Sequence, residues 1–161
     1  MTLTTISGLP AHVLLVHALV VFAPLTALLE TLCALWPAAR RHLVWLVLAL
    51  AVVTAALTPI TANAGGWLYD QERHHRDILN VHADRGGVMI YFSVALLAVS
   101  VVLAVVHRRE GRAAASGLVV NVVVAVVTIV VGAATVVQVV RIGESGARSV
   151  WANELTKSDK P

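Results

Sequence analysis

Three histidines at the ends of apolar segments are the residues of this chain best suited to chemistry. His12 and His17 lie in the first apolar segment, and His82 lies just before the third. Polar side chains in or beside a membrane span are costly to insert and are usually functional. Imidazole is also a common ligand of haem iron, zinc and copper. The sequence therefore favours a haem or metal site between helices.

The composition places the chain among membrane proteins. Of its 161 residues 58% are hydrophobic and 13% are charged, whereas a soluble domain has about 25% charged residues. The net charge of +3 does not indicate nucleic-acid binding, because the basic residues cluster in short loops where membrane orientation signals lie. The single cysteine, Cys33, excludes an internal disulfide, a cysteine-pair zinc site and a covalently attached haem.

Four apolar stretches are long enough to cross a bilayer, which takes about 18 residues or more. The first is not expected to be a signal peptide, since it has no basic leader and is too long. We predict an all-α integral membrane four-helix bundle that forms a single domain over residues 1–161. Its expected spans are residues 11–36, 43–62, 88–106 and 113–140, followed by a polar tail from 143 to 161.

The loop expected between spans two and three, residues 63–87, contains a short amphipathic segment. Trp67, Leu68, Ile78 and Leu79 alternate with charged residues at roughly helical spacing. This pattern is typical of a helix that lies on the membrane surface.

Four spans place both termini on one side of the membrane, here named side A; the opposite side is side B. The short loops on side B carry five basic residues against one acid, which predicts that side B is cytoplasmic and that both termini are extracytoplasmic. Basic residues in the C-terminal tail count against this orientation. The residues concerned are Arg40, Arg41, Arg108, Arg109, Arg112 and Glu110 on side B, and Arg141, Arg148, Lys157 and Lys160 in the tail.

Side A collects polar residues from all four spans. His12 and His17 point about 140° apart on a regular helix, so both can face one site only if the helix is irregular near Pro10. His17 lies deeper and is the preferred ligand, with His12 at the mouth or behind it. His82 opens the third span and faces the same side.

The other histidines have simpler interpretations. His42 and His107 lie beside arginines on side B as interfacial residues, and His74 and His75 lie in a charged stretch as solvated residues. Glu30 lies within the first span, where it is either protonated or directed toward the basic residues of side B; its role stays open. Serine and threonine stripes on the spans predict close helix packing with hydrogen bonds between helices.

Several short motifs, in this order, resemble a bacterial four-span membrane family known as domain of unknown function 2231. The resemblance covers nearly the whole chain and implies a multi-pass protein of the bacterial cytoplasmic membrane, with no established activity. The motifs are Gly8–His12 with Leu15–His17, Thr61–Gly65, His82–Ala83 with Gly86, and Arg141–Gly143 with Ser145–Ala147 and Val150–Trp151. The family usually has histidine where this chain has Glu144. A carboxylate suits zinc, iron or manganese but not a low-spin haem.

Two cofactor hypotheses and one alternative follow. In the first, His17 and His82 bind haem b, with Arg85 and Arg141 beside its propionates, for electron transfer with a redox partner. In the second, zinc, copper or iron is held by the metal ligands His12, His17, His82 and Glu144. In the alternative, the chain is a non-catalytic membrane subunit or a partner-binding protein whose polar cluster is structural. The expected partners are the lipid bilayer and either a redox partner or further copies of the chain in a homo-oligomer. No catalytic motif is recognisable, so enzymatic activity stays an open question.

Overall fold

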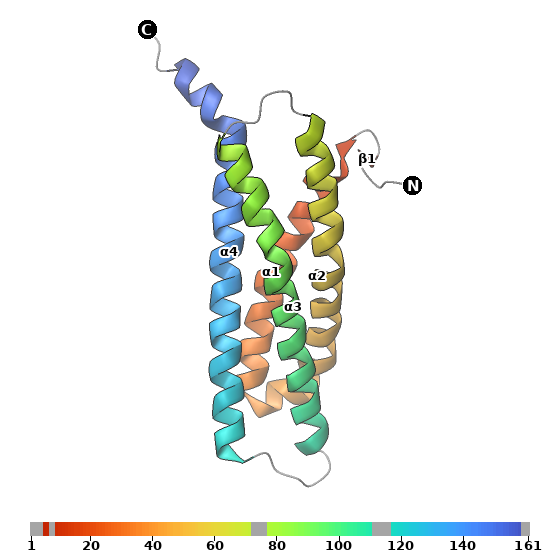
Figure 1. Cartoon of the computed structure of the whole chain (residues 1–161). Helices are drawn as coiled ribbons and strands as arrows, with labels where there is room; N and C mark the ends of the chain where they lie inside the picture. Colours follow the sequence, from red (N-terminus) through yellow and green to blue (C-terminus); the bar gives the residue numbers. More distant parts are fainter. Residues whose placement is uncertain (1–4, 7–8, 72–76, 111–116, 159–161) are drawn as a thin grey trace.

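The computed structural model of the chain describes residues 5–6, 9–71, 77–110 and 117–158, most of which lie in long helices (Figure 1). The helices are α1 (Ala11–Leu35), α2 (Pro37–Gln71), α3 (Asp77–Glu110) and α4 (Leu118–Ser158). A two-residue antiparallel ladder of β1 (Thr5–Ile6) and β2 (Leu9–Pro10) precedes α1. The predicted all-α four-helix bundle is confirmed, with this short ladder as an addition.

All four helices are long and apolar enough to cross a membrane. Large apolar side chains lie exposed on their outer faces, among them Leu28 at 65% and Val130 at 61%. Such a surface suits lipid contact. A helix also bonds its own backbone groups, as the hydrocarbon layer requires. The four helices are thus the four membrane spans that the composition predicts.

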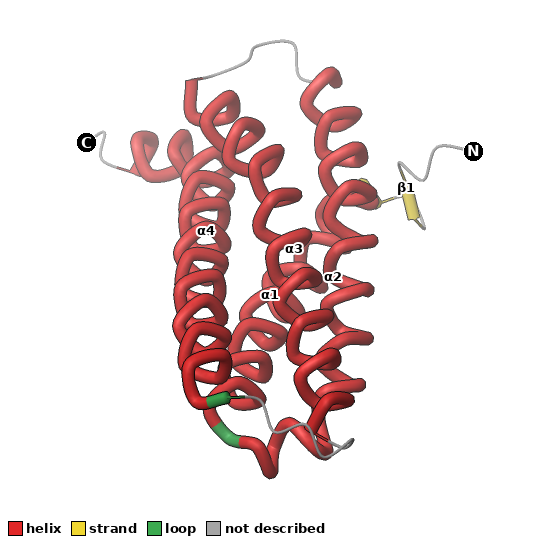
Figure 2. Tube along the Cα trace, turned by 60° about the horizontal axis from the view of Figure 1, so that its bottom comes forward, coloured by secondary structure: helices red, strands yellow, loops and turns green. Residues whose placement is uncertain are grey.

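The helices pack side by side in the order of the sequence, and α4 closes the bundle against α1 (Figures 1 and 2). Each helix contacts two neighbours extensively, and α1 and α3 face each other across the diagonal with few contacts. Since adjacent helices are antiparallel, α1 and α3 begin on side A, at the top of Figure 1, and α2 and α4 end there. This topology brings His12 on α1 and His82 on α3 to one end of the bundle.

The connection between α1 and α2 is the single residue Trp36. Its backbone is extended, with φ −125° and ψ 101°, because the following Pro37 disfavours a helical conformation there. Proline is well suited to the first position of a helix, so α2 begins at once. The predicted loop of residues 37–42 is therefore wrong: Arg40 and Arg41 belong to α2, and Arg40 is buried at 1% exposure.

The segment between spans two and three is helical, but it does not form a separate surface helix. Trp67 and Leu68 continue α2, which ends at Gln71, and Ile78 and Leu79 belong to α3, which begins at Asp77. The extensions contact each other through a hydrogen bond in which the Tyr69 hydroxyl donates to Asn80 Oδ1 at 2.7 Å. His74 and His75 lie outside the described residues. The predicted tail likewise continues α4 as far as Ser158.

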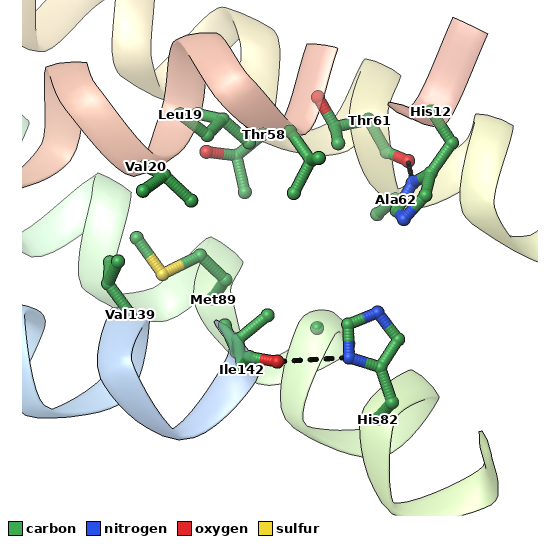
Figure 3. Close-up of a pocket in the computed structure, with 12 residues that line it drawn as sticks. His12, Leu19, Val20, Thr58, Thr61, Ala62, His82, Met89, Val139 and Ile142 are labelled. Carbon is green, nitrogen blue, oxygen red and sulfur yellow. Dashed lines mark hydrogen bonds between the residues drawn. The ribbon is translucent and has the colours of Figure 1, made fainter. Parts of the chain in front are cut away.

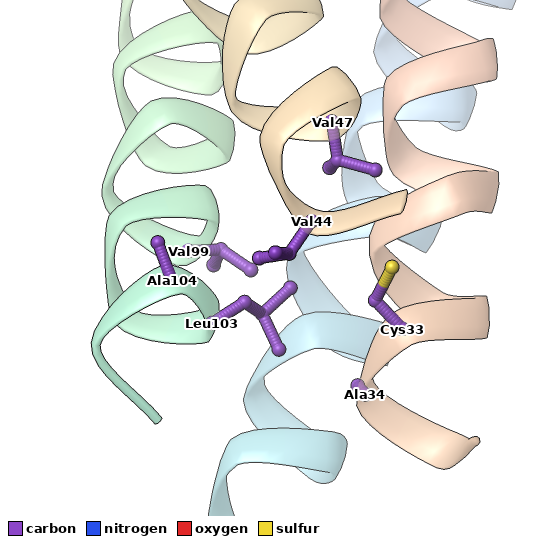
Figure 4. Close-up of a cluster of buried hydrophobic side chains, with 7 residues drawn as sticks. All are labelled: Cys33, Ala34, Val44, Val47, Val99, Leu103 and Ala104. Atoms are coloured by element: carbon purple, nitrogen blue, oxygen red, sulfur yellow. The ribbon is translucent and has the colours of Figure 1, made fainter. Parts of the chain in front are cut away.

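Small and medium apolar residues fill the interior in two clusters. The cluster nearer side B contains Cys33, Ala34, Val44, Val47, Val99, Leu103 and Ala104 (Figure 4). The cluster nearer side A contains Ala23, Ala27, Met89 and Leu96. Small side chains let helices approach closely in a membrane: a Cβ added at Gly132 of α4 would lie 3.4 Å from the Ala27 Cβ of α1.

Most hydroxyl groups in the bundle do not bond between helices as predicted. Thr54, Thr58, Thr128 and Thr135 are buried, and each donates to the carbonyl four residues earlier in its own helix. A hydroxyl on Cβ reaches this carbonyl easily, so its hydrogen bond is satisfied locally. Ser100 differs, because its hydroxyl crosses to another helix and donates to Glu30. The middle of the bundle is consequently held mainly by the shapes of the packed side chains.

Candidate functional site

A pocket of about 60 Å³ lies between the four helices at side A and is here named the side-A pocket (Figure 3). His12 and His82 lie at its outer end, and Val20 and Met89 lie deeper in the bundle. Apolar side chains form most of the wall between them. Its lining residues are His12, Val16, Leu19, Val20, Thr58, Thr61, Ala62, His82, Gly86, Met89, Val139 and Ile142.

His12 and His82 face each other from the diagonal helices α1 and α3. Their ring centroids are 6.2 Å apart, and the ring planes are nearly perpendicular, at 83°. Figure 3 shows the two rings on opposite sides of the pocket, with one ring nitrogen of each on the side that faces the other ring. The pair thus meets the first requirement for shared ligation, which is two imidazoles from different helices.

His12 is fixed by α2 on two sides. Its Nδ1 lies 2.9 Å from the Thr61 carbonyl oxygen. A carbonyl only accepts, so Nδ1 donates and the lone pair of the neutral ring lies on Nε2. The ring also lies directly against Gly65, where an added Cβ would come within 2.8 Å of it. Glycine at this position makes room for the imidazole.

His82 is fixed by α4 in the same way. Its Nδ1 lies 3.2 Å from the Ile142 carbonyl oxygen and 3.3 Å from Ser145 Oγ. An added Cβ at Gly146 would lie 3.0 Å from the ring. Both imidazoles thus donate Nδ1–H to a backbone carbonyl and rest on a glycine of the adjacent helix. A histidine that binds metal through one nitrogen almost always donates its other N–H in this manner.

His17 lies outside the side-A pocket. It is exposed, and its Nδ1 lies 2.5 Å from the Val13 carbonyl oxygen of its own helix. Helix α1 begins at Ala11, so both histidines are helical and point about 140° apart. The sequence favours His17 as the partner of His82, whereas in this geometry His12 faces His82.

The two arginines of the haem hypothesis lie at side A but do not line the pocket. Arg85 is half-buried and donates from Nη1 to the Arg141 carbonyl at 3.0 Å. Gln138 Nε2 donates to the Arg85 carbonyl at 2.8 Å. The Arg141 side chain is exposed. Arg85 thus joins α3 to α4 just outside the histidine pair.

Glu144 also lies away from the histidines. It is exposed and forms an ion pair with Arg148 at 2.6 Å, one turn further along α4. The neighbouring residue, Ser145, is buried beside His82, because consecutive helical residues point about 100° apart. Among the described residues no three histidine, cysteine, aspartate or glutamate side chains lie close enough to hold a metal ion. The predicted site of three histidines and a carboxylate is not assembled.

The histidines of side B are arranged as interfacial residues. His42 is exposed, and His107 contacts the Trp45 ring at a centroid distance of 6.3 Å. The Arg108 guanidinium lies over the same ring, 4.9 Å from its centroid. Aromatic and basic side chains of this kind are typical of a membrane–water boundary.

A comparison with protein families matches residues 8–159 to a family described as "Predicted membrane protein (DUF2231)". The chain belongs to this family. The match spans all four helices, and the description names a membrane protein without an activity. Searches of curated proteins and of solved structures found no match.

Two of the motifs that resemble the DUF2231 family form the surroundings of the histidine pair. The run from Thr61 to Gly65 supplies the carbonyl and the glycine that hold His12. For His82, Ile142 supplies the carbonyl, Ser145 a hydroxyl and Gly146 the glycine. A search of the sequence for reactive side chains does not find these residues, because their contribution is a backbone carbonyl, a hydroxyl or the absence of a side chain.

Substitution of Gly65 by alanine is expected to displace His12 and destabilise the bundle by about 1–3 kcal/mol, the usual cost of overpacking. Gly66→Ala is the matched control, since an added Cβ there meets nothing within 4 Å. Denaturation of the detergent-solubilised protein measures both. Equal stability of the two variants would contradict this account of Gly65. Gly146→Ala and Gly143→Ala form the corresponding pair for His82, because Gly143 is also open.

Proposed function

We propose that this protein binds haem b between α1 and α3, with His12 and His82 as the two axial ligands, and that it transfers electrons. The observation that supports the proposal is the shared arrangement of the two imidazoles, each with Nδ1 bonded to a carbonyl and Nε2 left for a ligand. Haem iron in membrane bundles is held by imidazoles from different helices. His12 and His82 meet this requirement at one end of the bundle.

The number of protein ligands favours haem over a bare ion. A porphyrin supplies four nitrogen ligands to its iron and leaves two axial positions for the protein. A structural zinc site takes four protein ligands, and a catalytic zinc site takes three. The described part of the chain brings two imidazoles together and adds no third ligand of the usual kind. The apolar wall from Leu19 to Met89 also suits the edge of a macrocycle.

The size of the pocket favours a second candidate, a copper, zinc or iron ion with water as its remaining ligands. The side-A pocket has a volume of about 60 Å³, whereas pockets for drug-sized ligands occupy about 300–1,000 Å³. A haem would have to move α1 and α3 apart, while an ion bound at about 2.0–2.1 Å from each nitrogen would not. Both candidates use the same two Nε2 atoms.

The charge distribution supports an extracytoplasmic position for the pocket. Arg41, Arg108 and Arg109 are exposed at side B, and basic residues mark the cytoplasmic side of a span. Side A, where α1 begins and α4 ends, then faces the outside of the bacterial cytoplasmic membrane. A redox partner or a second copy of the chain would approach the haem from there, past the half-buried Arg85.

Absorption spectroscopy of the full chain tests the proposal. The protein is purified in detergent from cells supplied with a haem precursor, and the apoprotein is titrated with haemin and, in parallel, with copper, zinc and iron salts. We expect a Soret band and one haem per chain. One equivalent of a bare ion and no haem would instead support the second candidate. If the protein bound neither haem nor a metal ion, both candidate functions would be overturned. The alternative, a non-catalytic membrane subunit with a structural polar cluster, would then be left.

A further inference from the structure

A second polar pair lies in the half of the bundle nearer side B. Glu30 of α1 is fully buried, at 0% exposure, and Ser100 of α3 is buried at 1%. The Ser100 hydroxyl donates to Glu30 Oε1 at 2.6 Å. The other carboxyl oxygen, Oε2, is buried and has no hydrogen-bond partner in the part of the chain that the structure describes.

Glu30 has no ion-pair partner among the described residues. The buried guanidinium of Arg40 on α2 pairs with Glu110 of α3 at 2.9 Å. Cys33, the other titratable group nearby on α1, is a buried free thiol, and α4 carries no titratable side chain between Leu118 and Val140. A charged carboxylate buried within a span is costly. A proton on Oε2 removes that charge.

The two polar pairs lie on the same faces of the same two helices. Glu30 follows His12 by 18 residues, and Ser100 follows His82 by 18 residues. At 3.6 residues per turn this is five turns, or about 27 Å along the axis. The hydrocarbon layer is about 30 Å thick. The diagonal α1–α3 pairs thus lie near opposite ends of the membrane-spanning core.

Apolar side chains lie between the two polar pairs. Leu19 and Ala23 of α1 and Met89 and Leu96 of α3 are buried apolar residues at the intermediate levels. The nearby threonine hydroxyls donate to carbonyls of their own helices. Glu30 precedes Leu35, the last residue of α1, by little more than one turn. Its carboxyl group is therefore nearer the surface at side B than the pocket at side A.

We propose that Glu30 is a proton-binding site of its own, a carboxylic acid inside the membrane that binds one exchangeable proton. Ser100 is a positioning residue that fixes the carboxyl group through Oε1. The site needs no cofactor in the side-A pocket and does not depend on the proposed haem.

Infrared spectroscopy and carbodiimide labelling of the full chain test this site. A protonated carboxylic acid has a carbonyl stretching band that a carboxylate lacks, and the band shifts in heavy water if the proton exchanges. Dicyclohexylcarbodiimide reacts with such acids in apolar surroundings. The acid proton moves to a carbodiimide nitrogen, the carboxyl oxygen bonds to the central carbon, and the adduct rearranges to an N-acylurea without a leaving group.

We expect the acid band and one adduct on the Glu30 peptide in the wild-type protein, and loss of both in Glu30→Gln. The amide keeps an acceptor for Ser100, so this variant should fold, which its helicity and melting check. Glu144→Gln is the matched control, because Glu144 is exposed, and should keep both signals. Ser100→Ala should keep the band but shift it. The proposal would be overturned if the wild-type protein had no acid band that disappears in Glu30→Gln, or if that band did not shift in heavy water. His82→Ala, which lacks one of the proposed haem ligands, should keep both the acid band and the adduct. Failure of the haem proposal would therefore leave the result for Glu30 unchanged.

Discussion

His82→Ala is expected to abolish the six-coordinate haem spectrum and to weaken haem binding by more than about 100-fold. Loss of a group that only supports a metal ligand costs 10–100-fold in affinity, so loss of the ligand itself should cost more. The substitution also removes the bond to the Ile142 carbonyl. Absorption spectra and haemin titrations of the purified variant measure the effect. His12→Ala should behave alike, because the two imidazoles have equivalent surroundings.

His17→Ala provides the matched control for these variants. His17 lies on the same helix but is exposed and does not line the side-A pocket, so its removal should leave the spectrum and the affinity unchanged. Free imidazole added to His82→Ala should restore part of the six-coordinate signal by occupying the vacated position. If His17→Ala lost the signal while His12→Ala kept it, the assignment of the ligands would be wrong.

Glu110→Ala is expected to destabilise the bundle by about 3 kcal/mol. Arg40 is almost fully buried, with 2% of its side chain exposed, and Glu110 is 28% exposed. Removing the carboxylate leaves a buried charge without a partner, which typically costs about 3–5 kcal/mol. Arg40→Met should cost less, because the partly exposed Glu110 can be hydrated. Denaturation of the solubilised variants by a harsh detergent compares them.

The double variant Arg40→Met/Glu110→Ala distinguishes the ion pair from ordinary packing. With the buried charge gone, it should be more stable than Glu110→Ala alone, since neighbouring substitutions that share an interaction are not additive. If instead the two single effects were equal and simply added, the pair would contribute nothing specific to stability.

The spans could be predicted from the sequence, but the ends of the helices could not. Apolar composition indicates which residues lie in the hydrocarbon layer. The helices extend beyond this layer: α2 continues to Gln71, and α3 already begins at Asp77. Backbone hydrogen bonds hold these extensions in helical form, whatever the polarity of their side chains. The opposite error occurred at Arg40, where charge predicted a loop and the residue is buried in α2.

The side of the bundle that carries the site could also be predicted, whereas the residues that face one another could not. Topology alone brings His12, His17 and His82 to side A. The choice between His12 and His17 depends on which face of α1 contacts α2, and this is set by Thr61 and Gly65. Those contacts involve a carbonyl oxygen and a missing side chain, neither of which has a recognisable signature among reactive residues.

The hydrogen bonds divide the bundle into two helical hairpins, α1–α2 and α3–α4. At the side-A pocket each imidazole bonds within its own hairpin, His12 to Thr61 and His82 to Ile142. Toward side B the polar contacts cross from one hairpin to the other, through Glu30 with Ser100 and Arg40 with Glu110. Apart from the hydrogen bond between Tyr69 and Asn80, these polar contacts between the hairpins lie toward side B, and the bonds that orient the two rings would not break if the hairpins parted at side A.

Such a division gives the bundle a natural hinge at side B. A rotation of one hairpin by about 6° would widen the pocket, roughly 27 Å away, by about 3 Å. The bond between Tyr69 and Asn80 joins the two hairpins beyond the pocket and limits this rotation. A flat macrocycle could enter between two rings that are already oriented, and the energetic cost of entry would fall on apolar packing rather than on the hydrogen bonds that hold His12 and His82.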